Sequence, residues 1–290
     1  MVAYFGWGFT LFSRLMSLAT ALMTAVVVSM MCPVLPGSSD ESMREYTVRY
    51  EGRVSVPKDN NTMVLEELHT LAEEEYRAFN TKITPTNQTI LGVRMPMLRK
   101  IAKRIVIEEQ AVDFISLDKQ NIYEMILLEG MVLSYLDKPF IELLPLTENF
   151  LRKVDNWAQV DLTVCNFTNM AKQKEDVLGV VRKWIQSDKE FFVRAGLVVL
   201  LGHFVEKEHL KMVFEISQEV THTGYYVSMG NAWLISCCMA KFPEETIGFF
   251  KNNTLDIRTH NKAIQKSRES YRVPKEDKVL LQGLKKGHRG

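Results

Sequence analysis

Four side chains in the middle of the chain have the types that could act on a positively charged substrate: Trp157, Asp161, Arg194 and Trp233. Trp157 and Asp161 are four residues apart, so a helix would place them on one face. Arg194 is the one charged residue of an apolar stretch, and Trp233 lies in another apolar stretch. Aromatic rings attract a cation through their faces, and a carboxylate pairs with it directly. This combination indicates chemistry on a cationic group.

The same four residues also have a purely structural interpretation. A tryptophan in a helical repeat is commonly a core residue. Asp161 and Arg194 could form a buried ion pair that joins two repeats. A carboxylate among Leu, Val and Phe residues is costly unless it is paired or functional. The residue types alone therefore leave a functional cluster and a structural pair both open.

The elements that position these residues are predicted to be helices. From Met63 onward, apolar residues recur at spacings of three and four almost everywhere, and no alternating strand pattern longer than about four residues is present. Four prolines stand where a first helical turn should begin: Pro96, Pro139, Pro243 and Pro274. The helical patterns cover 63–79, 96–109, 121–136, 140–154, 157–169, 175–186, 190–205, 208–219, 225–241, 243–251, 258–271 and 275–285.

These helices form pairs that repeat along the chain. The pairs begin near Asn121, Trp157, Glu190, Tyr225 and Arg258, at intervals of 36, 33, 35 and 33 residues. This period is typical of an α-solenoid, in which neighbouring pairs bury each other's apolar faces. We therefore expect an all-α, HEAT-like solenoid of stacked antiparallel helix pairs, whose first helices line a concave groove.

Metal, disulfide and nucleotide-binding chemistry find little support in the sequence. The four cysteines include no C-x-x-C pair, and the six histidines include no H-x-x-x-H or H-E-x-x-H pattern. The G-x-x-x-x-G-K-[ST], G-x-G-x-x-G and G-x-S-x-G motifs are also missing. We expect no metal and no cofactor.

The N-terminal region differs from the rest of the chain. Residues 1–37 hold a single charged residue, Arg14, and the apolar run 15–32 has the minimum length for a membrane span. It could be a membrane anchor or uncleaved signal, a cleaved signal, or an extension that results from a start assigned too early. Residues 38–62 are predicted to be a linker, and residues 63–290 the helical domain. The expected location is cytoplasmic, with anchoring through 15–32 as the alternative.

The helical domain resembles the AlkD-like DNA alkylation repair family, the HEAT-like-repeat DNA glycosylases. The W-x-x-x-D spacing, the Arg one repeat later and the Trp one repeat after that are together fairly specific, and the stretch 76–82 (YRAFNTK) is similar to a divergent subgroup. The resemblance extends over roughly Met63 to Lys278. Its segments are ILGVRMPMLRKIAKRI, DNWAQVD, SDKEFFVRAGLVVLL, GYYVSMGNAWLISCCMAKFPE and THNKAIQKSRESYRV.

The resemblance implies a monomeric enzyme that acts on double-stranded DNA carrying alkylated bases. It implies hydrolysis of the N-glycosidic bond of cationic alkylpurines such as N3-methyladenine and N7-methylguanine. In these terms Asp161 matches the catalytic carboxylate, Trp157 and Trp233 match residues that flank the lesion, and Arg194 matches a basic residue that faces the backbone. The alternative is a non-catalytic helical-repeat module that binds a DNA structure or serves as a protein scaffold.

Two basic regions are consistent with DNA binding. Residues 94–104 hold five Lys or Arg and no acid, and residues 258–290 hold ten against three acids, although the whole chain has a net charge of only +1. Basic residues at both ends of a groove would contact phosphates, whereas each region alone could be a solvated helix face. The candidate DNA contacts are Arg94, Arg99, Lys100, Lys103, Arg258, Lys262, Lys266 and Arg268.

Overall fold

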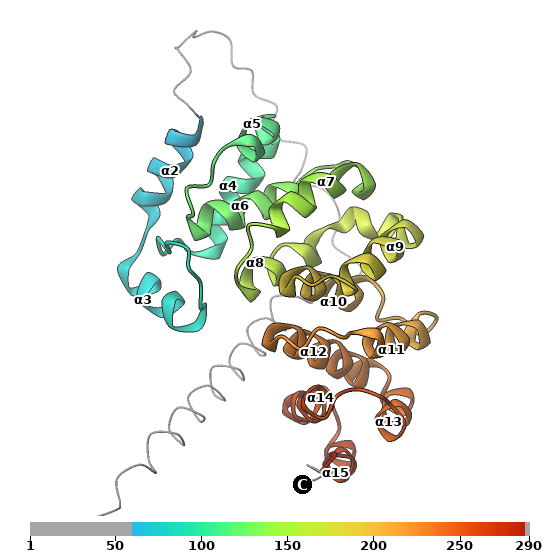
Figure 1. The fold of residues 1–290 in the computed structure, drawn as a ribbon. Helices are drawn as coiled ribbons and strands as arrows, with labels where there is room; N and C mark the ends of the chain where they lie inside the picture. Colours follow the sequence, from blue (N-terminus) through green and yellow to red (C-terminus); the bar gives the residue numbers. More distant parts are fainter. Residues whose placement is uncertain (1–59, 288–290) are drawn as a thin grey trace, which may run out of the picture. The chain divides into compact units, whose positions relative to one another are not determined.

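The computed structural model describes residues 60–287, which form an all-α helical-repeat fold (Figure 1). No strand forms within these residues; one isolated β-bridge joins Thr89 to Ile122. The elements are α2 (Asn60–Leu71), α3 (Glu74–Ile83), α4 (Met95–Ile107), α5 (Ala111–Ser116), α6 (Tyr123–Tyr135), α7 (Phe140–Leu151), α8 (Trp157–Asp161), η1 (Val164–Asn166), η2 (Thr168–Lys172), α9 (Lys174–Ile185), α10 (Glu190–His203), α11 (Leu210–Glu219), α12 (Tyr225–Lys241), α13 (Pro243–Lys251), α14 (Ile257–Glu269) and α15 (Lys275–Gly283).

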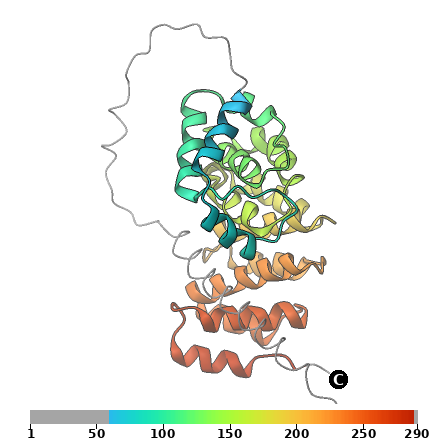
Figure 2. The same cartoon turned by 90° about the vertical axis from the view of Figure 1, so that its left-hand side faces the viewer.

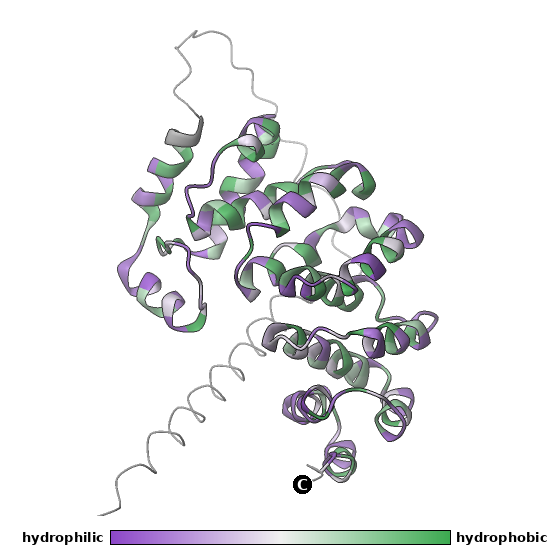
Figure 3. Ribbon diagram, in the orientation of Figure 1, coloured by the Kyte–Doolittle hydropathy of each residue, from purple (hydrophilic) through white to green (hydrophobic). Residues whose placement is uncertain are grey.

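The helices stack in two layers, as the repeat predicts. In the first layer α6 packs on α8, α8 on α10, α10 on α12 and α12 on α14, while in the second α7 packs on α9 and α9 on α11. Figure 2 shows the successive pairs lying one below another from the yellow α9 to the red α15. Hydrophobic residues dominate α6, α10 and α12, whereas α14 is more hydrophilic (Figure 3). Helices α6, α10 and α12 of the first layer are therefore largely buried.

Helix starts follow local sequence rules. Pro96 and Pro243 lie in the first turn of α4 and α13, and Pro139 and Pro274 directly precede α7 and α15. Proline suits these positions because it lacks the N–H that a first turn leaves unpaired. Asp256 caps α14 by accepting hydrogen bonds from the backbone N–H groups of Arg258 and Thr259. The predicted boundaries of these helices are thus confirmed to within a few residues.

Two predicted helices are interrupted. The pattern over 63–79 is divided between α2 and α3, because Glu73 adopts an extended conformation and its N–H bonds to the Gly92 carbonyl at 3.0 Å. The pattern over 157–169 forms only the five residues of α8, followed by the 3₁₀ turns η1 and η2. Within this segment the Thr163 hydroxyl donates to the Gln159 carbonyl at 2.6 Å, where the regular helix has already ended. A hydrogen bond between distant residues accompanies the first interruption, and a local bond from a side chain to the backbone accompanies the second.

A buried carboxylate on α6 holds the loop that precedes α4, and a second one pairs with a lysine between α7 and α8. Glu124 is fully buried and accepts hydrogen bonds from the backbone N–H groups of Leu91, Gly92 and Val93 at 2.9, 2.8 and 3.3 Å. One turn later, the buried Glu129 pairs with Lys153 at 2.7 Å. A buried charge is tolerated when donors surround it in this way. The loop is therefore fixed to the first layer by charge as well as by packing.

The predicted N-terminal extension (1–37) and most of the predicted linker (38–62) lie outside the described residues, so these boundaries stay predictions. The apolar run 15–32 and its membrane alternative lie there as well. Among the described helices, none has the length and apolar character needed to cross a bilayer.

The tight packing of α6 generates a stability prediction. A Cβ atom on Gly130 would lie 2.6 Å from both Phe150 Cζ and Thr163 Cγ2, whereas a Cβ on Gly179, in the exposed face of α9, would meet nothing within 4 Å. Gly130→Ala is expected to lower the free energy of unfolding by about 1–3 kcal/mol. Gly179→Ala should raise it by roughly 0.5–1 kcal/mol, because alanine favours helix. Urea unfolding of both variants measures this; equal effects would contradict the described packing of α6.

Candidate functional site

Asp161 and Arg194 form a buried, bidentate ion pair. Arg194 Nε donates to Asp161 Oδ1 at 2.9 Å, and Nη2 donates to Oδ2 at 2.7 Å. The two residues are only 2% and 5% exposed. Paired parallel hydrogen bonds of this type are among the strongest side-chain interactions in proteins. The structure therefore brings together the two charged residues that the sequence singled out.

Arg194 also connects this pair to the next repeat. Its Nη1 donates to the Tyr226 carbonyl, at the start of α12, at 2.6 Å. The approach depends on a small residue, since a Cβ atom on Gly230 would lie 3.3 Å from the same Nη1. One guanidinium thus joins α8, α10 and α12.

Polar contacts position α8, although it is only five residues long. Asn156 caps the helix by accepting from the Gln159 N–H at 3.1 Å. The Gln159 amide donates to Gln88 Oε1 at 2.6 Å, and Asp155 accepts from the Thr86 hydroxyl at 2.6 Å. These bonds tie the start of α8 to the loop after α3. Asp161 is consequently held by its own repeat and by residues about 70 positions earlier.

The two tryptophans occupy different surroundings. Trp157 is half-buried, lies one turn before Asp161, and donates from Nε1 to the Ile83 carbonyl at 3.2 Å. Trp233 is 8% exposed and lies on α12, the helix that Arg194 contacts. The residues Trp157, Asp161, Arg194 and Trp233 therefore come from three consecutive first-layer helices.

A group of aromatic residues lies at the starts of α10 and α12 and was not among the site residues predicted from the sequence. The rings of Phe191 and Tyr226 lie 5.6 Å apart, and those of Tyr225 and Tyr226 lie 5.2 Å apart. Tyr225 is 51% exposed. Burial raises the pKa of Tyr226, whose surroundings include the charges of Arg194 and Asp155. The two adjacent tyrosines at a helix start are the feature of the sequence that could have identified this group. Their rings are partly exposed and lie near the ion pair.

The basic residues predicted on α4 differ in their availability. Arg94 is exposed but forms two hydrogen bonds from Nε to Glu73 at 2.8 and 2.9 Å, which raise its pKa. Lys103 lies over the Tyr135 ring at 5.8 Å. Lys100 is exposed and Arg99 is half-buried. Arg94, one of the four basic residues predicted to contact DNA in this region, is thus already paired with Glu73.

The basic residues predicted on α14 also differ. Arg258 is exposed, and Lys262 donates to Gln265 Oε1 at 3.1 Å. Arg268 donates from Nε to the Lys278 carbonyl at 3.1 Å. Lys266 is only 8% exposed, so it does not lie on an exposed face, as the predicted contact with DNA requires. Burial and the charges of Lys262 and Arg194 lower its pKa to about 8.

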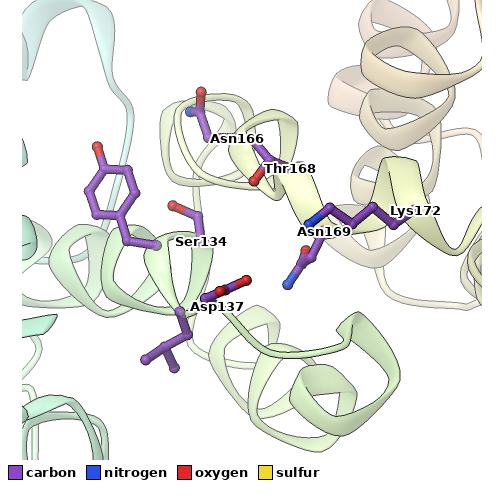
Figure 4. Close-up of a pocket in the computed structure, with 8 residues that line it drawn as sticks. Ser134, Asp137, Asn166, Thr168, Asn169 and Lys172 are labelled. Carbon is purple, nitrogen blue, oxygen red and sulfur yellow. The ribbon is translucent and has the colours of Figure 1, made fainter. Parts of the chain in front are cut away.

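A separate polar cavity of about 290 Å³ opens at the end of α6. Figure 4 shows its labelled side chains coming from the end of α6 and from the segment that includes η1 and η2. None of the predicted site residues lines it. The lining residues are Ser134, Tyr135, Leu136, Asp137, Asn166, Thr168, Asn169 and Lys172.

One group of side chains has atoms close enough to hold a cation. Ligand atoms of Glu206, Glu208 and His209 lie within 4.8 Å of one another, beyond the end of α10. The Lys174 ammonium already bonds to Glu206 at 2.5 Å and lowers the pKa of that carboxyl. This group lies beyond the C-terminal end of α10, whereas Arg194 lies near the start of that helix.

The sequence of the helical repeats matches one known family. The model of the family described as DNA alkylation repair enzyme matches residues 64–266. The chain belongs to this family. Comparison with curated proteins yields no match. The matched range includes Trp157, Asp161, Arg194 and Trp233, and it ends at Lys266.

Membership of the DNA alkylation repair family confirms the resemblance inferred from the sequence and gives the protein a role in the repair of alkylated DNA. The matched range contains α8, α10 and α12, the three helices that the Asp161–Arg194 pair joins. The roles predicted for individual residues stay predictions.

The buried ion pair generates a second stability prediction. Asp161→Asn removes the negative charge and leaves the Arg194 guanidinium buried without a counter-charge. The free energy of unfolding should fall by about 3–5 kcal/mol. In the matched control, Glu73→Gln removes the exposed pair with Arg94 and should cost less than about 1 kcal/mol. Thermal and urea unfolding measure both; equally small losses would show that the Asp161–Arg194 pair is not a structural element.

Proposed function

We propose that this protein is a monofunctional DNA glycosylase. It binds double-stranded DNA that carries alkylated bases and hydrolyses the N-glycosidic bond of cationic alkylpurines such as N3-methyladenine and N7-methylguanine. The observation that carries the proposal is the buried Asp161–Arg194 pair within a chain of the DNA alkylation repair family.

Asp161 is suited to the charge that this reaction develops. A methylated purine is cationic and already a good leaving group, and its departure builds positive charge on the sugar. A nearby carboxylate stabilises that charge and orients the attacking water. A carboxylate offers about four acceptor sites, and Arg194 uses one on each oxygen. The remaining sites can face a water and the sugar. This chemistry requires neither a metal nor a redox cofactor.

Arg194 and the tryptophans support binding of the lesion. A guanidinium has five N–H donors. Arg194 uses three of them, two for the Asp161 oxygens and one for the Tyr226 carbonyl, so that the others can bond to a DNA phosphate. Trp157 and Trp233 offer aromatic faces to a cationic base. The exposed Tyr225 extends this aromatic surface toward solvent.

The arrangement of charge supports a localised DNA-binding surface. Lys100 on α4 and Arg258 on α14 are exposed and lie on opposite sides of the three central repeats in the stack. Phosphate contacts at both ends would fix the register of the duplex. The net charge of +1 predicts modest affinity for DNA in general.

One observation favours a second candidate function. Arg194 engages both oxygens of Asp161, as in a structural connection between repeats. The alternative is therefore a non-catalytic module of the same fold that binds a DNA structure or a protein.

Base excision distinguishes the two functions. The protein should release N7-methylguanine from methylated duplex DNA, and Asp161→Asn should lower the rate by at least ~100-fold, because the developing charge loses its carboxylate. Asp176→Asn is the matched control: Asp176 is exposed on α9 of the second layer, so the same change of side chain there should retain excision. Chromatography of released bases measures the rate.

Two checks accompany this assay. Circular dichroism at the assay temperature must show folded protein, since Asp161→Asn is also expected to be less stable. Duplex binding by the same variant must persist. Tight DNA binding without release of any base by the unchanged protein would overturn the glycosylase and favour the non-catalytic module.

Salt dependence of binding tests the DNA surface. Lys100→Gln and Arg258→Gln should each reduce the slope of log affinity against log salt by about 1, because each removes one phosphate contact. Arg182→Gln is the control, since Arg182 lies on α9 of the second layer and pairs with Glu219 at 3.0 Å. Fluorescence anisotropy with duplex DNA measures the slopes. Weak binding that is indifferent to salt would favour a protein scaffold.

A further inference from the structure

The residues that follow α15 are fastened across the start of α14. Helix α15 packs on α14 at the end of the stack (Figure 1). Residues 284–287 then lie against α14 and the loop before it, and we call them the terminal strap. The family model matches the chain only as far as Lys266. The strap therefore lies outside the part of the chain that the family describes.

Several hydrogen bonds hold the strap in one position. Asn261 on α14 pairs with Lys286 in both directions, because its Nδ2 donates to the Lys286 carbonyl and its Oδ1 accepts from the Lys286 N–H, each at 2.9 Å. The fully buried His260 donates from Nε2 to the Leu284 carbonyl at 2.9 Å. The Lys286 ammonium donates to two backbone carbonyls of the loop before α14, at 3.3 and 3.1 Å. Chain ends without such contacts are commonly poorly ordered, so these bonds are what fixes the strap.

The strap is attached at the edge of the stack that carries the candidate site. Arg194 donates to the Tyr226 carbonyl at the start of α12. Two residues later, the Ser228 hydroxyl is hydrogen-bonded to the Thr259 hydroxyl of α14 at 2.9 Å. Thr259 is followed two residues later by Asn261, which binds the strap. Hydrogen bonds thus connect the ion pair, helix by helix, to the place where the strap is fastened.

The strap brings a free basic side chain to this edge. Lys285 is exposed, and among residues 60–287 no hydrogen bond or ion pair occupies its ammonium. Arg258 is exposed as well and lies three residues before Asn261, so both are on one face of α14. The nearby Asp256 carboxylate is used by the helix itself, because its Oδ1 accepts from two N–H groups of the first turn at 3.0 Å. Two cations at one fixed place favour a polyanionic partner.

We propose that the terminal strap is a DNA-binding element, in which Lys285 joins Arg258 in contacting phosphates of the bound duplex. The inference rests on the proposed function, because its partner is the DNA on which Asp161 acts. Phosphate contacts give affinity and fix the register of the duplex without reading its sequence. Asn261 and Lys286 are positioning residues, since their own polar groups are already bonded within the protein. The strap extends the DNA surface beyond the part of the chain that the family model matches.

Fluorescence anisotropy of the full chain with an unmodified duplex tests the phosphate contact. Lys285→Gln should lower the slope of log affinity against log salt by about 1, because one phosphate contact is lost. Lys275→Gln is the matched control, since it removes an exposed lysine at the opposite end of α15 and should leave the slope unchanged. If Lys285→Gln has the same slope as the unchanged protein, the proposal is wrong.

Asn261→Ala tests the fastening of the strap, because it releases Lys286 and leaves every charge in place. Alanine favours helix, so α14 should persist, which circular dichroism checks. Affinity and salt slope should fall, since Lys285 is no longer held beside the phosphate. Adding Lys285→Gln to this variant should cause little further loss, because the two changes remove one contact. Losses that simply add, or a slope that Asn261→Ala leaves unchanged, would contradict the positioning by the strap.

Lysine footprinting gives a readout that needs no variant. An acetylating reagent modifies exposed lysines of the unchanged protein, and mass spectrometry measures the rate at each one. With saturating duplex, Lys285 should react several-fold more slowly, whereas Lys275 should keep its rate. Equal reactivity of Lys285 with and without DNA overturns the proposal, even where a variant does not fold.

The unmodified duplex separates this proposal from the glycosylase itself, because binding is then measured without base excision. Protection of Lys285 without release of N7-methylguanine from methylated DNA would support the strap and overturn the glycosylase. Normal release of the base and a reduced slope for Arg258→Gln, with no effect of Lys285→Gln, would overturn the strap alone.

Discussion

The Asp161–Arg194 ion pair is the interaction on which the central repeats depend. In a solenoid each helix pair contacts mainly its neighbours, so stability is set at the interfaces between repeats. Most of these interfaces are apolar, but here a guanidinium bonds to a carboxylate on α8 and to a backbone carbonyl on α12. Hydrophobic packing tolerates sliding between helices, whereas bidentate hydrogen bonds do not. The pair therefore fixes the register of three successive first-layer helices.

The short helix α8 explains why the N-terminal part of the domain matters to the site. Five residues cannot maintain a helix by themselves. Its position comes from Asp155 and Gln159, which bond to the loop after α3, and that loop is in turn held by Glu124 on α6. A series of polar contacts thus extends from α6 to α8, the helix that carries Asp161. Substitutions in the loop over 84–93 would therefore change the position of the Asp161 carboxylate without contacting it.

The sequence predicted the fold well and the site in part, for identifiable physical reasons. Helical periodicity and first-turn prolines are local signals, and they placed nearly every helix. The break after Asp161 was not predicted, because the apolar spacing continues through it while the Thr163 hydroxyl bonds to the Gln159 carbonyl. The charge of Lys266 indicated a phosphate contact, but packing between α12 and α14 buries it. The reverse holds for Asp161 and Arg194, where the cost of burying a charge already predicted a partner.

The structural and the catalytic interpretations of this ion pair are compatible. A carboxylate in a dry environment without a positive partner is neutralised by taking up a proton, and a neutral acid cannot stabilise a cationic sugar. Arg194 supplies a positive partner directly beside the buried Asp161 carboxyl group. The same burial that strengthens this pair also strengthens the attraction of Asp161 for charge that develops next to it. A connection between repeats is therefore also the environment that a catalytic carboxylate needs.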